Sequence, residues 1–162
     1  MTLNGPDDFR KAYGCFATGV AVATTVGADG EPAGMTISSF NSVSLEPPLV
    51  LWSIAHDAKC FDAFMRADYF AIHVLGEKQQ DLSGRFATRD NDKFVDLDWA
   101  QGLNGNPILP EFAACFECST EHRYEGGDHV IIVGRVRRFE DRELDPLIFY
   151  RGAYHGKRSP TS

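Results

Sequence analysis

The sequence predicts a mainly β protein, built as an antiparallel barrel or sandwich with helical decorations between its strands. Two observations support this fold class. Five to seven short runs are rich in β-branched and aromatic residues and end at turn signals, whereas only two or three short segments have helical spacing. Strand and long helix do not alternate regularly, so a parallel doubly wound sheet is not expected.

The chain is long enough for one domain with a substantial core, since 43% of its 162 residues are hydrophobic. We expect a single domain over residues 1–162, with a core at about 6–156 and a polar tail at 157–162. The net charge of −7 argues against a nucleic-acid-binding surface, because such a surface needs a concentrated basic stripe.

Other features of the sequence favour a cytoplasmic protein. No segment approaches the ~20 apolar residues of a membrane-spanning helix, so no membrane association is expected. Residues 1–14 lack the basic-then-apolar profile of a signal peptide. The four cysteines are too sparse for a disulfide scaffold, and we expect them to be reduced thiols.

Cys115 and Cys118 form a C-x-x-C motif within a predicted strand. Such a motif can indicate redox chemistry or half of a zinc site, but a second pair of ligands at suitable spacing is missing. Side chains three residues apart on a strand point to opposite faces. We therefore expect two buried thiols that pack as small hydrophobic residues.

The first part of the chain is expected to form a helix and then a β-hairpin. Pro6 opens a helical pattern that Gly19 ends, with apolar residues at three- and four-residue spacing. These apolar residues are Phe9, Ala12, Tyr13 and Phe16. Residues 20–26 are rich in β-branched residues and stop at the Asp-Gly turn of 27–32, so residues 20–44 are expected to pair as a hairpin.

The remaining elements follow from the same two periodicities. They are strands at 47–54, 69–75 and 147–150, two strands within 111–141, and helices at 57–67 and 77–88. Residues 89–107 are charged and rich in Gly and Asn, which is typical of a long surface excursion.

Residues 35–44, MTISSFNSVS, alternate like a strand, yet no charged residue lies between Glu31 and Glu46. Two interpretations remain open. The hydroxyls are either the solvated face of an edge strand, or a polar groove that binds a neutral heteroaromatic edge or a phosphate. Lys59, at the start of a predicted helix, would supply a positive charge to such a phosphate.

Common catalytic and nucleotide-binding motifs are missing from the sequence. It has no G-x-G-x-x-G after a strand, no P-loop and no G-x-S-x-G elbow. Ser38, Ser39 and Ser42 have no histidine close in sequence, which does not favour a serine hydrolase. His73 lies in a strand pattern, as expected of a structural histidine. His129 follows a Gly-rich turn and is either a solvated surface residue or a ligand contact.

Six segments have an order and spacing that point to one family. They are ATGVAVATT, GMTISSFNSVSLEPPLVLWSI, AKCFDAF, SGRFA with DKF, YEGGDHVIIVGRV and PLIFYRGAY, within about residues 6–156. In these segments the chain resembles the short-chain flavin reductase family, the NAD(P)H:flavin oxidoreductases that serve two-component flavin-dependent monooxygenases. The Thr-x-Ser-Ser-x-x-Ser strand, the Pro-Pro strand and the Gly-Asp-His turn are specific in combination, although each alone is weak.

The resemblance implies a split β-barrel of the FMN-binding type, usually a homodimer with the flavin near the subunit interface. The flavin would be FMN or FAD, and the co-substrate NADH or NADPH. The residues implied as cofactor contacts are Thr36, Ser38, Ser39, Asn41, Ser42, Val43, Ser53, Ile54, Lys59, Arg85, Phe86, Lys93, Phe94, His129 and Tyr154. His129 is also the implied catalytic residue, since it would orient the nicotinamide or stabilise charge.

Two details of the resemblance bear on the site. Ser39 and Asn41 fall on the nominally apolar face of residues 35–44, so a flavin contact by both faces requires a bend near Ser39. Family members often carry Ser or Thr near Ala58 and Cys60, where hydroxyls help to hold phosphate. This chain has Ala58-Lys59-Cys60 instead, which leaves the flavin preference open.

The activity implied by the resemblance is NAD(P)H-dependent reduction of flavin by direct hydride transfer. Reduced flavin would then pass by diffusion to a partner monooxygenase. An uncharged groove suits this task, because hydroxyls can hydrogen-bond the flavin ring while leaving it redox-active. The alternatives are a non-catalytic flavin carrier or store on the same barrel, and an interaction module without a cofactor.

Overall fold

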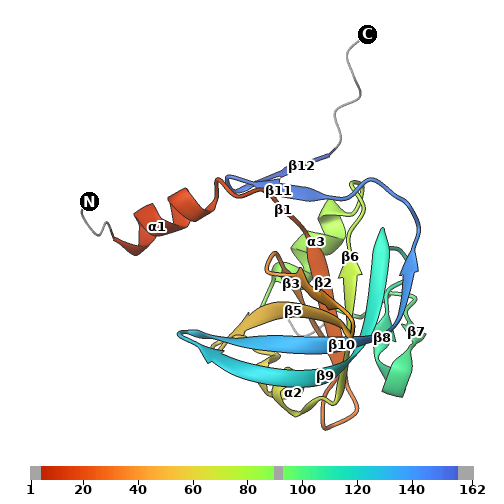
Figure 1. Ribbon diagram of the computed structural model, residues 1–162. Helices are drawn as coiled ribbons and strands as arrows, with labels where there is room; N and C mark the ends of the chain where they lie inside the picture. The colour runs from red at the N-terminus through yellow and green to blue at the C-terminus, as the bar shows by residue number, and fades with distance from the viewer. Residues whose placement is uncertain (1–4, 90–92, 157–162) are drawn as a thin grey trace.

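A seven-stranded antiparallel sheet is the main element of the computed structural model, which describes residues 5–89 and 93–156 (Figure 1). Its strands are β2 (Ala21–Val26), β3 (Pro32–Ile37), β4 (Asn41–Leu45), β5 (Pro48–Ala55), β6 (Tyr69–Val74), β9 (Ala114–Gly126) and β10 (His129–Asp141). They pair in the order β3-β2-β6-β9-β10-β5-β4. The mainly β, antiparallel prediction is confirmed, whereas the expected tail at 157–162 lies outside the described residues.

The core lies under the central strands of this sheet. β2 and β6 each bury at least four consecutive residues, as expected of strands that are covered on both faces. β5 alternates instead, and it directs Val50, Trp52 and Ile54 into the core. The Trp52 ring packs edge-on against Phe64 and Phe70, at 4.8 and 5.9 Å between ring centroids.

The predicted hairpin over residues 20–44 is only half correct. β2 and β3 do pair as a hairpin, with Ala21 opposite Ile37 and Val26 opposite Pro32. The expected second strand then breaks at residues 38–40, and β4 pairs with β5 at the other edge of the sheet. A two-residue periodicity indicates the face of the sheet on which a side chain lies. It does not indicate which strand is the neighbour.

Ser39 fixes the point at which the chain crosses between the two edges. Its hydroxyl accepts a hydrogen bond from the Ser53 N–H at 3.0 Å and donates to the Ser53 carbonyl at 3.3 Å. The backbone at Ser39 has no strand partner there, so its side chain takes the place of a ladder contact. A register shift between Ser42 and Ser44 follows in β4, and the bend expected near Ser39 is present.

α1 (Pro6–Tyr13) is shorter than the sequence predicts and projects from the body of the protein (Figure 1). Pro at its start, acidic residues in its first turn and basic residues in its last turn favour the helix. It ends before Gly14, so Phe16 lies beyond it and Gly19 belongs to a strand. None of its residues is buried.

A small second sheet connects the two ends of the described chain. It consists of β1 (Thr18–Gly19), β11 (Ile148–Tyr150) and β12 (Ala153–His155), in the order β1-β11-β12. The last strand predicted at 147–150 is therefore confirmed, and β12 is an addition to it. Figure 1 places this sheet beside α3 (Gln80–Ala87), near the base of α1.

The other two predicted helices are present but shorter. α2 (Phe61–Arg66) begins four residues after the expected start at Asp57, because residues 56–60 form turns at the end of β5. α3 (Gln80–Ala87) begins three residues after Glu77. Both helices have a buried Phe, Phe64 and Phe86 respectively, which packs each helix against the sheet.

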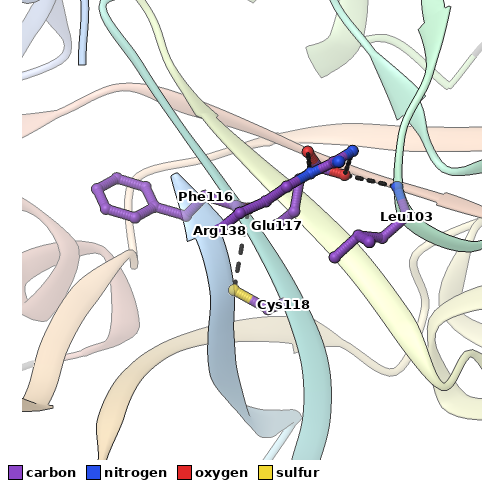
Figure 2. A network of polar contacts seen from close by, with 5 residues as sticks. All are labelled: Leu103, Phe116, Glu117, Cys118 and Arg138. Carbon is purple, nitrogen blue, oxygen red and sulfur yellow. Dashed lines mark hydrogen bonds and ion pairs between the residues drawn. The ribbon is translucent and has the colours of Figure 1, made fainter. Parts of the chain in front are cut away.

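Over its described residues, the excursion at 89–107 has only short helices and strands, and a network of polar contacts attaches it to the main sheet. Its described part contains β7 (Ala100–Gln101) and η1 (Leu103–Gly105), followed by β8 (Pro107–Ile108). The Glu117 carboxylate accepts hydrogen bonds from the Leu103 N–H at 2.6 Å and from the Arg138 guanidinium (Figure 2). Since the Glu117 side chain is only 10% exposed, these charge-assisted contacts tie the excursion to β9 and β10.

The two cysteines of the C-x-x-C motif lie on β9. Cys115 and Cys118 are both free and buried, and they belong to different core clusters on opposite sides of the strand. Burial raises the pKa of each thiol to about 12. The prediction of two buried thiols that pack as small hydrophobic residues is therefore confirmed.

His73 is a structural histidine of the core, as expected. Its side chain is fully buried on β6, where Nδ1–H donates to the Val22 carbonyl at 3.2 Å. The Leu109 N–H donates to its Nε2, also at 3.2 Å. Burial lowers the pKa of His73 from 6.5 to about 4, although the hydrogen bond to Val22 and the charge of Glu117 act in the opposite direction.

This burial predicts a loss of stability on mild acidification. Below pH 6.5 the unfolded chain takes up a proton at His73 that the folded chain does not take up until about pH 4. The free energy of unfolding should therefore fall by about 2 kcal/mol between pH 7 and pH 5. Urea titrations measure this fall, and nitrogen NMR of the ring should find His73 neutral at pH 5. A ring that is protonated at pH 6 would contradict the account.

Gly34 allows β3 to lie close to α3 and to β2. A Cβ at this position would lie 2.9 Å from Cε1 of Phe86 and 3.0 Å from the carbonyl oxygen of Ala23. The Phe86 ring is fully buried, and the second contact is backbone, so neither neighbour can move away at low cost.

Gly34→Ala should therefore lower the free energy of unfolding by about 1–3 kcal/mol. Gly84→Ala on α3 is the matched control, because a Cβ there would meet nothing within 4 Å. We expect the control to raise stability by about 0.5–1 kcal/mol, as alanine favours a helix over glycine. Urea denaturation followed by tryptophan fluorescence compares the two, and equal stabilities would show that the close packing is unimportant.

Candidate functional site

A cavity of about 1100 Å³ lies between three segments that are far apart in the sequence. The first is the turn at 27–31 with β3, the second runs from the end of β5 through α2, and the third runs from the end of α3 into residues 93–99. The first two walls belong to β3 and β5, strands near opposite edges of the seven-stranded order. The volume is sufficient for a large planar ligand.

One wall of the cavity is aromatic. Phe86 packs edge-on against Phe94 at 5.1 Å between ring centroids, and Phe94 packs edge-on against Trp99 at 6.2 Å. Gly34 and Met35 of β3 line the cavity beside Phe86. Aromatic and apolar walls of this kind suit a planar ring system.

Lys93 places a positive charge inside the cavity. Its Nζ donates to the Gly34 carbonyl at 3.1 Å and to the Phe86 carbonyl at 3.0 Å, which joins β3 to the end of α3. Its charge also reaches Cys60, another cavity residue, where it lowers the thiol pKa. Desolvation is the larger effect at Cys60, so the pKa of this thiol is raised overall.

The rim of the cavity carries charges of both signs. The Arg89 guanidinium donates to the Asp57 carboxylate at 3.0 Å, which links the end of α3 to the turn after β5. Other charged residues lining the cavity are Asp29, Glu31, Lys59, Asp62 and Arg66. The opening is therefore polar, whereas the wall beside β3 is apolar.

Five of the residues expected as cofactor contacts line this cavity. They are Thr36, Lys59, Phe86, Lys93 and Phe94. Thr36 donates to the Ser83 carbonyl at 2.7 Å, so its hydroxyl holds β3 against α3. Ala58 and Cys60, the positions at which the chain departs from the family pattern, also line the cavity.

The expected contacts of the crossing, β4 and β5 do not line it. Ser38, Asn41, Ser42 and Val43 are exposed. Ser39 and Ser53 bond to each other as described above. The Ile54 side chain is fully buried in the core, and its backbone pairs with Val130 of β10. None of these residues lines the cavity of this one chain.

Arg85, Tyr154 and His129 lie around the cavity rather than in it. Arg85 donates to the Val95 carbonyl, and the Tyr154 hydroxyl lies 2.9 Å from Ser83 Oγ on α3. His129 begins β10 opposite Ala55, which does line the cavity. Its Nδ1 is 2.7 Å from Asp128 Oδ1, and this hydrogen bond lowers the pKa of the Asp128 carboxyl.

Sequence reasoning missed several cavity residues. The turn at 27–31, Asp57, Arg89 and Trp99 line the cavity, yet none of them belongs to a motif of binding residues. Of these residues, only Trp99 could have been noticed in the sequence. A single tryptophan in a charged, Gly-rich excursion indicates a segment that packs against the protein. The others become neighbours only through the pairing of distant strands.

Over residues 5–89 and 93–156, no three His, Cys, Asp or Glu side chains gather as a metal site would require. Within the same ranges, no helix combines the length and apolar character needed to cross a membrane.

Comparison with known proteins identifies the family. The flavin reductase like domain matches residues 13–158 of the chain. The FMN reductase (NADH) SmoA of Agrobacterium fabrum is 50% identical over 90% of this chain and 83% of that protein. The reductase subunit HsaB of a flavin-dependent monooxygenase from Rhodococcus jostii is 43% identical, over 93% of this chain and 77% of that protein. The chain spans about half, 49%, of a probable flavin reductase from Rhizobium meliloti to which it is 46% identical.

Solved structures agree with this result. A putative oxidoreductase from Sinorhizobium meliloti superposes with a TM-score of 0.91 at 46% identity, over 94% of this chain and 53% of that chain. The NADH:FAD oxidoreductase SgcE6 of Streptomyces globisporus, solved with NAD and FAD fragments, gives a TM-score of 0.89 at 36% identity, over 99% and 98%. The split-barrel fold that the sequence resemblance implies is confirmed, and the chain belongs to the flavin reductase like domain family.

Proposed function

We propose that this protein reduces FMN or FAD with NADH or NADPH and supplies the reduced flavin to a partner monooxygenase. The cavity beside β3 carries the proposal, because its aromatic wall suits the flavin ring and the cations of its mixed-charge rim suit phosphate. Relatives that bear reductase names at 43–50% identity support the same activity.

The residues present fit a flavin and a nicotinamide. When bound, a flavin supplies the acceptor for the hydride that a reduced nicotinamide donates. The protein would hold the two rings in alignment. Such alignment lowers the activation barrier of hydride transfer by several kcal/mol. Lys93 keeps a positive charge inside the cavity, which favours a ligand that gains electrons. Thr36 holds the β3 wall in place through Ser83.

We infer that His129 orients the nicotinamide. In the neutral ring Nδ1–H donates to Asp128, so Nε2 is left as a hydrogen-bond acceptor. An acceptor suits the carboxamide N–H of a nicotinamide. Asp128 then acts as a positioning residue, because it fixes the tautomer of His129 without contacting the ligand itself.

We further propose that the protein is a homodimer. Two groups of exposed apolar residues, one at α1 and one on β4 and β10, would lie at its interface. Phe9, Tyr13 and Phe16 are 65–71% exposed on and after α1. Leu45 on β4 and Phe139 on β10 are 93% and 70% exposed. Exposed apolar groups of this size are typical of an interface. Sedimentation equilibrium at micromolar concentration tests the dimer, and a monomer at that concentration would contradict it.

The cytoplasm is the compartment that we propose for this protein. Its four cysteines are all free, and NAD(P)H-dependent chemistry needs the cofactor pool of that compartment. Cell fractionation with an antibody to the protein tests this assignment.

Steady-state oxidation of NADH and NADPH with added FMN, FAD or riboflavin tests the activity. We expect many turnovers per protein molecule, whereas a flavin that binds and is never turned over would identify a carrier or store. A protein that binds no flavin at micromolar concentration would be an interaction module instead. The same assay ranks the flavins and the nicotinamides.

His129→Ala should lower kcat/KM for the nicotinamide about tenfold, which is roughly the effect of one lost hydrogen bond. His122→Ala is the matched control, since His122 is an exposed histidine on β9 that does not line the cavity. The control should leave both rate and KM unchanged. If His129→Ala also leaves both unchanged, the role assigned to His129 is wrong.

A further inference from the structure

Arg89 and Asp57 form an ion pair across the rim of the cavity. Arg89 follows α3, and Asp57 lies in the turn after β5, so the pair joins two walls that come from distant parts of the chain. Both side chains line the cavity, and both are about three-quarters exposed, at 77% and 75%. The pair therefore stands between solvent and the interior of the site.

We propose that Asp57 competes with the phosphate of the flavin for the guanidinium of Arg89, and that this competition weakens the binding of phosphorylated flavins. The inference rests on the proposed function, because it assigns a specificity role within the same cavity. It concerns the flavin phosphate alone.

The distribution of charge determines which end of a flavin lies at this pair. The wall at Phe86, Phe94 and Trp99 is aromatic, and a ring loses little on leaving water there. A phosphate keeps its charge at low cost only where it remains hydrated or meets cations. The exposed rim offers Arg89 and Lys59 among its carboxylates, so the anionic end of a bound flavin would meet cations and water there.

The ion pair is suited to exchange. An exposed pair of this kind adds little to stability, so breaking it costs the protein little. Arg binds phosphate through two parallel hydrogen bonds, which are stronger than its single contact of 3.0 Å with Asp57. The released Asp57 carboxylate then remains near the phosphate and repels it. Arg89 thus favours a phosphorylated flavin, and Asp57 disfavours it.

Weakened binding fits an enzyme whose reduced flavin must leave. A cavity with unopposed cations would retain FMN or FAD, whereas a rim with a competing carboxylate releases it more readily. Riboflavin carries no phosphate, so it should be insensitive to both residues. Removing the charge of Asp57 and removing that of Arg89 should therefore change FMN affinity in opposite directions. Neither change should affect riboflavin affinity.

The test is the Kd of FMN and of riboflavin, measured by quenching of flavin fluorescence. Asp57→Asn should tighten FMN binding about threefold to tenfold, and Arg89→Gln should weaken it about tenfold. In the double variant, Asp57→Asn should have a smaller effect than in the parent, because the guanidinium for which Asp57 competes is gone. Riboflavin affinity should change less than about twofold in all three variants.

A second exposed ion pair provides matched controls. Arg142 donates to Glu140 at 2.7 Å, and neither residue lines the cavity. Glu140→Gln and Arg142→Gln make the same changes of charge as the test variants, and we expect less than about a twofold change in FMN affinity. A similar shift in these controls would mean that net charge alone is responsible.

The failure of this inference can be distinguished from failure of the proposed function. If FMN binds and NADH is oxidised, but Asp57→Asn leaves FMN affinity unchanged or weaker, the competition is overturned and the activity stands. Equal shifts for FMN and riboflavin would also overturn it, since the phosphate would then have no part. If the parent protein binds neither flavin, both proposals are wrong.

Discussion

The chain between β3 and β4 crosses from one edge of the seven-stranded sheet to the other, and the hydroxyl of Ser39 holds this crossing against β5 through Ser53. The crossing lets a single sheet curl into a split barrel, because it joins strands that are consecutive in sequence and remote in the pairing order. The cavity depends on it, since its walls are β3 and the segment that follows β5.

Two of the hydroxyls in residues 35–44, those of Thr36 and Ser39, make contacts that hold the fold together. Thr36 donates to a carbonyl of α3 from within the paired strand β3. Ser39 bonds to both backbone groups of Ser53, and it does so where the chain has no strand partner. A charged side chain at either position would be partly buried without a partner. Thr36 lines the cavity while Ser38 and Ser42 are exposed, so the ligand groove stays a prediction.

The main elements of the fold could be predicted from the sequence because each depends on local spacing. Periodicity and residue type predict the strands β2, β5, β6, β9, β10 and β11, the cores of three helices, the buried thiols of Cys115 and Cys118 and the structural role of His73. They do not predict the short strands β1, β7, β8 and β12. The pairing of β4 with β5 could not be predicted in this way, because it depends on contacts between distant residues. The ion pair between Asp57 and Arg89 could not be predicted for the same reason, because the two residues are neighbours only in the folded chain. The family resemblance supplied the split barrel and five cavity residues, but it also named residues of β4 that lie outside the cavity of one chain.

Hydrogen exchange at the Ser53 amide is the most direct test of the crossing. In the wild-type protein this amide donates to Ser39 Oγ, so it should be protected. Ser39→Ala should speed its exchange at least about tenfold while the amides of the β2–β3 hairpin keep their protection, and Ser38→Ala should leave it unchanged. Unchanged exchange at Ser53 in Ser39→Ala would contradict the central role of this hydroxyl.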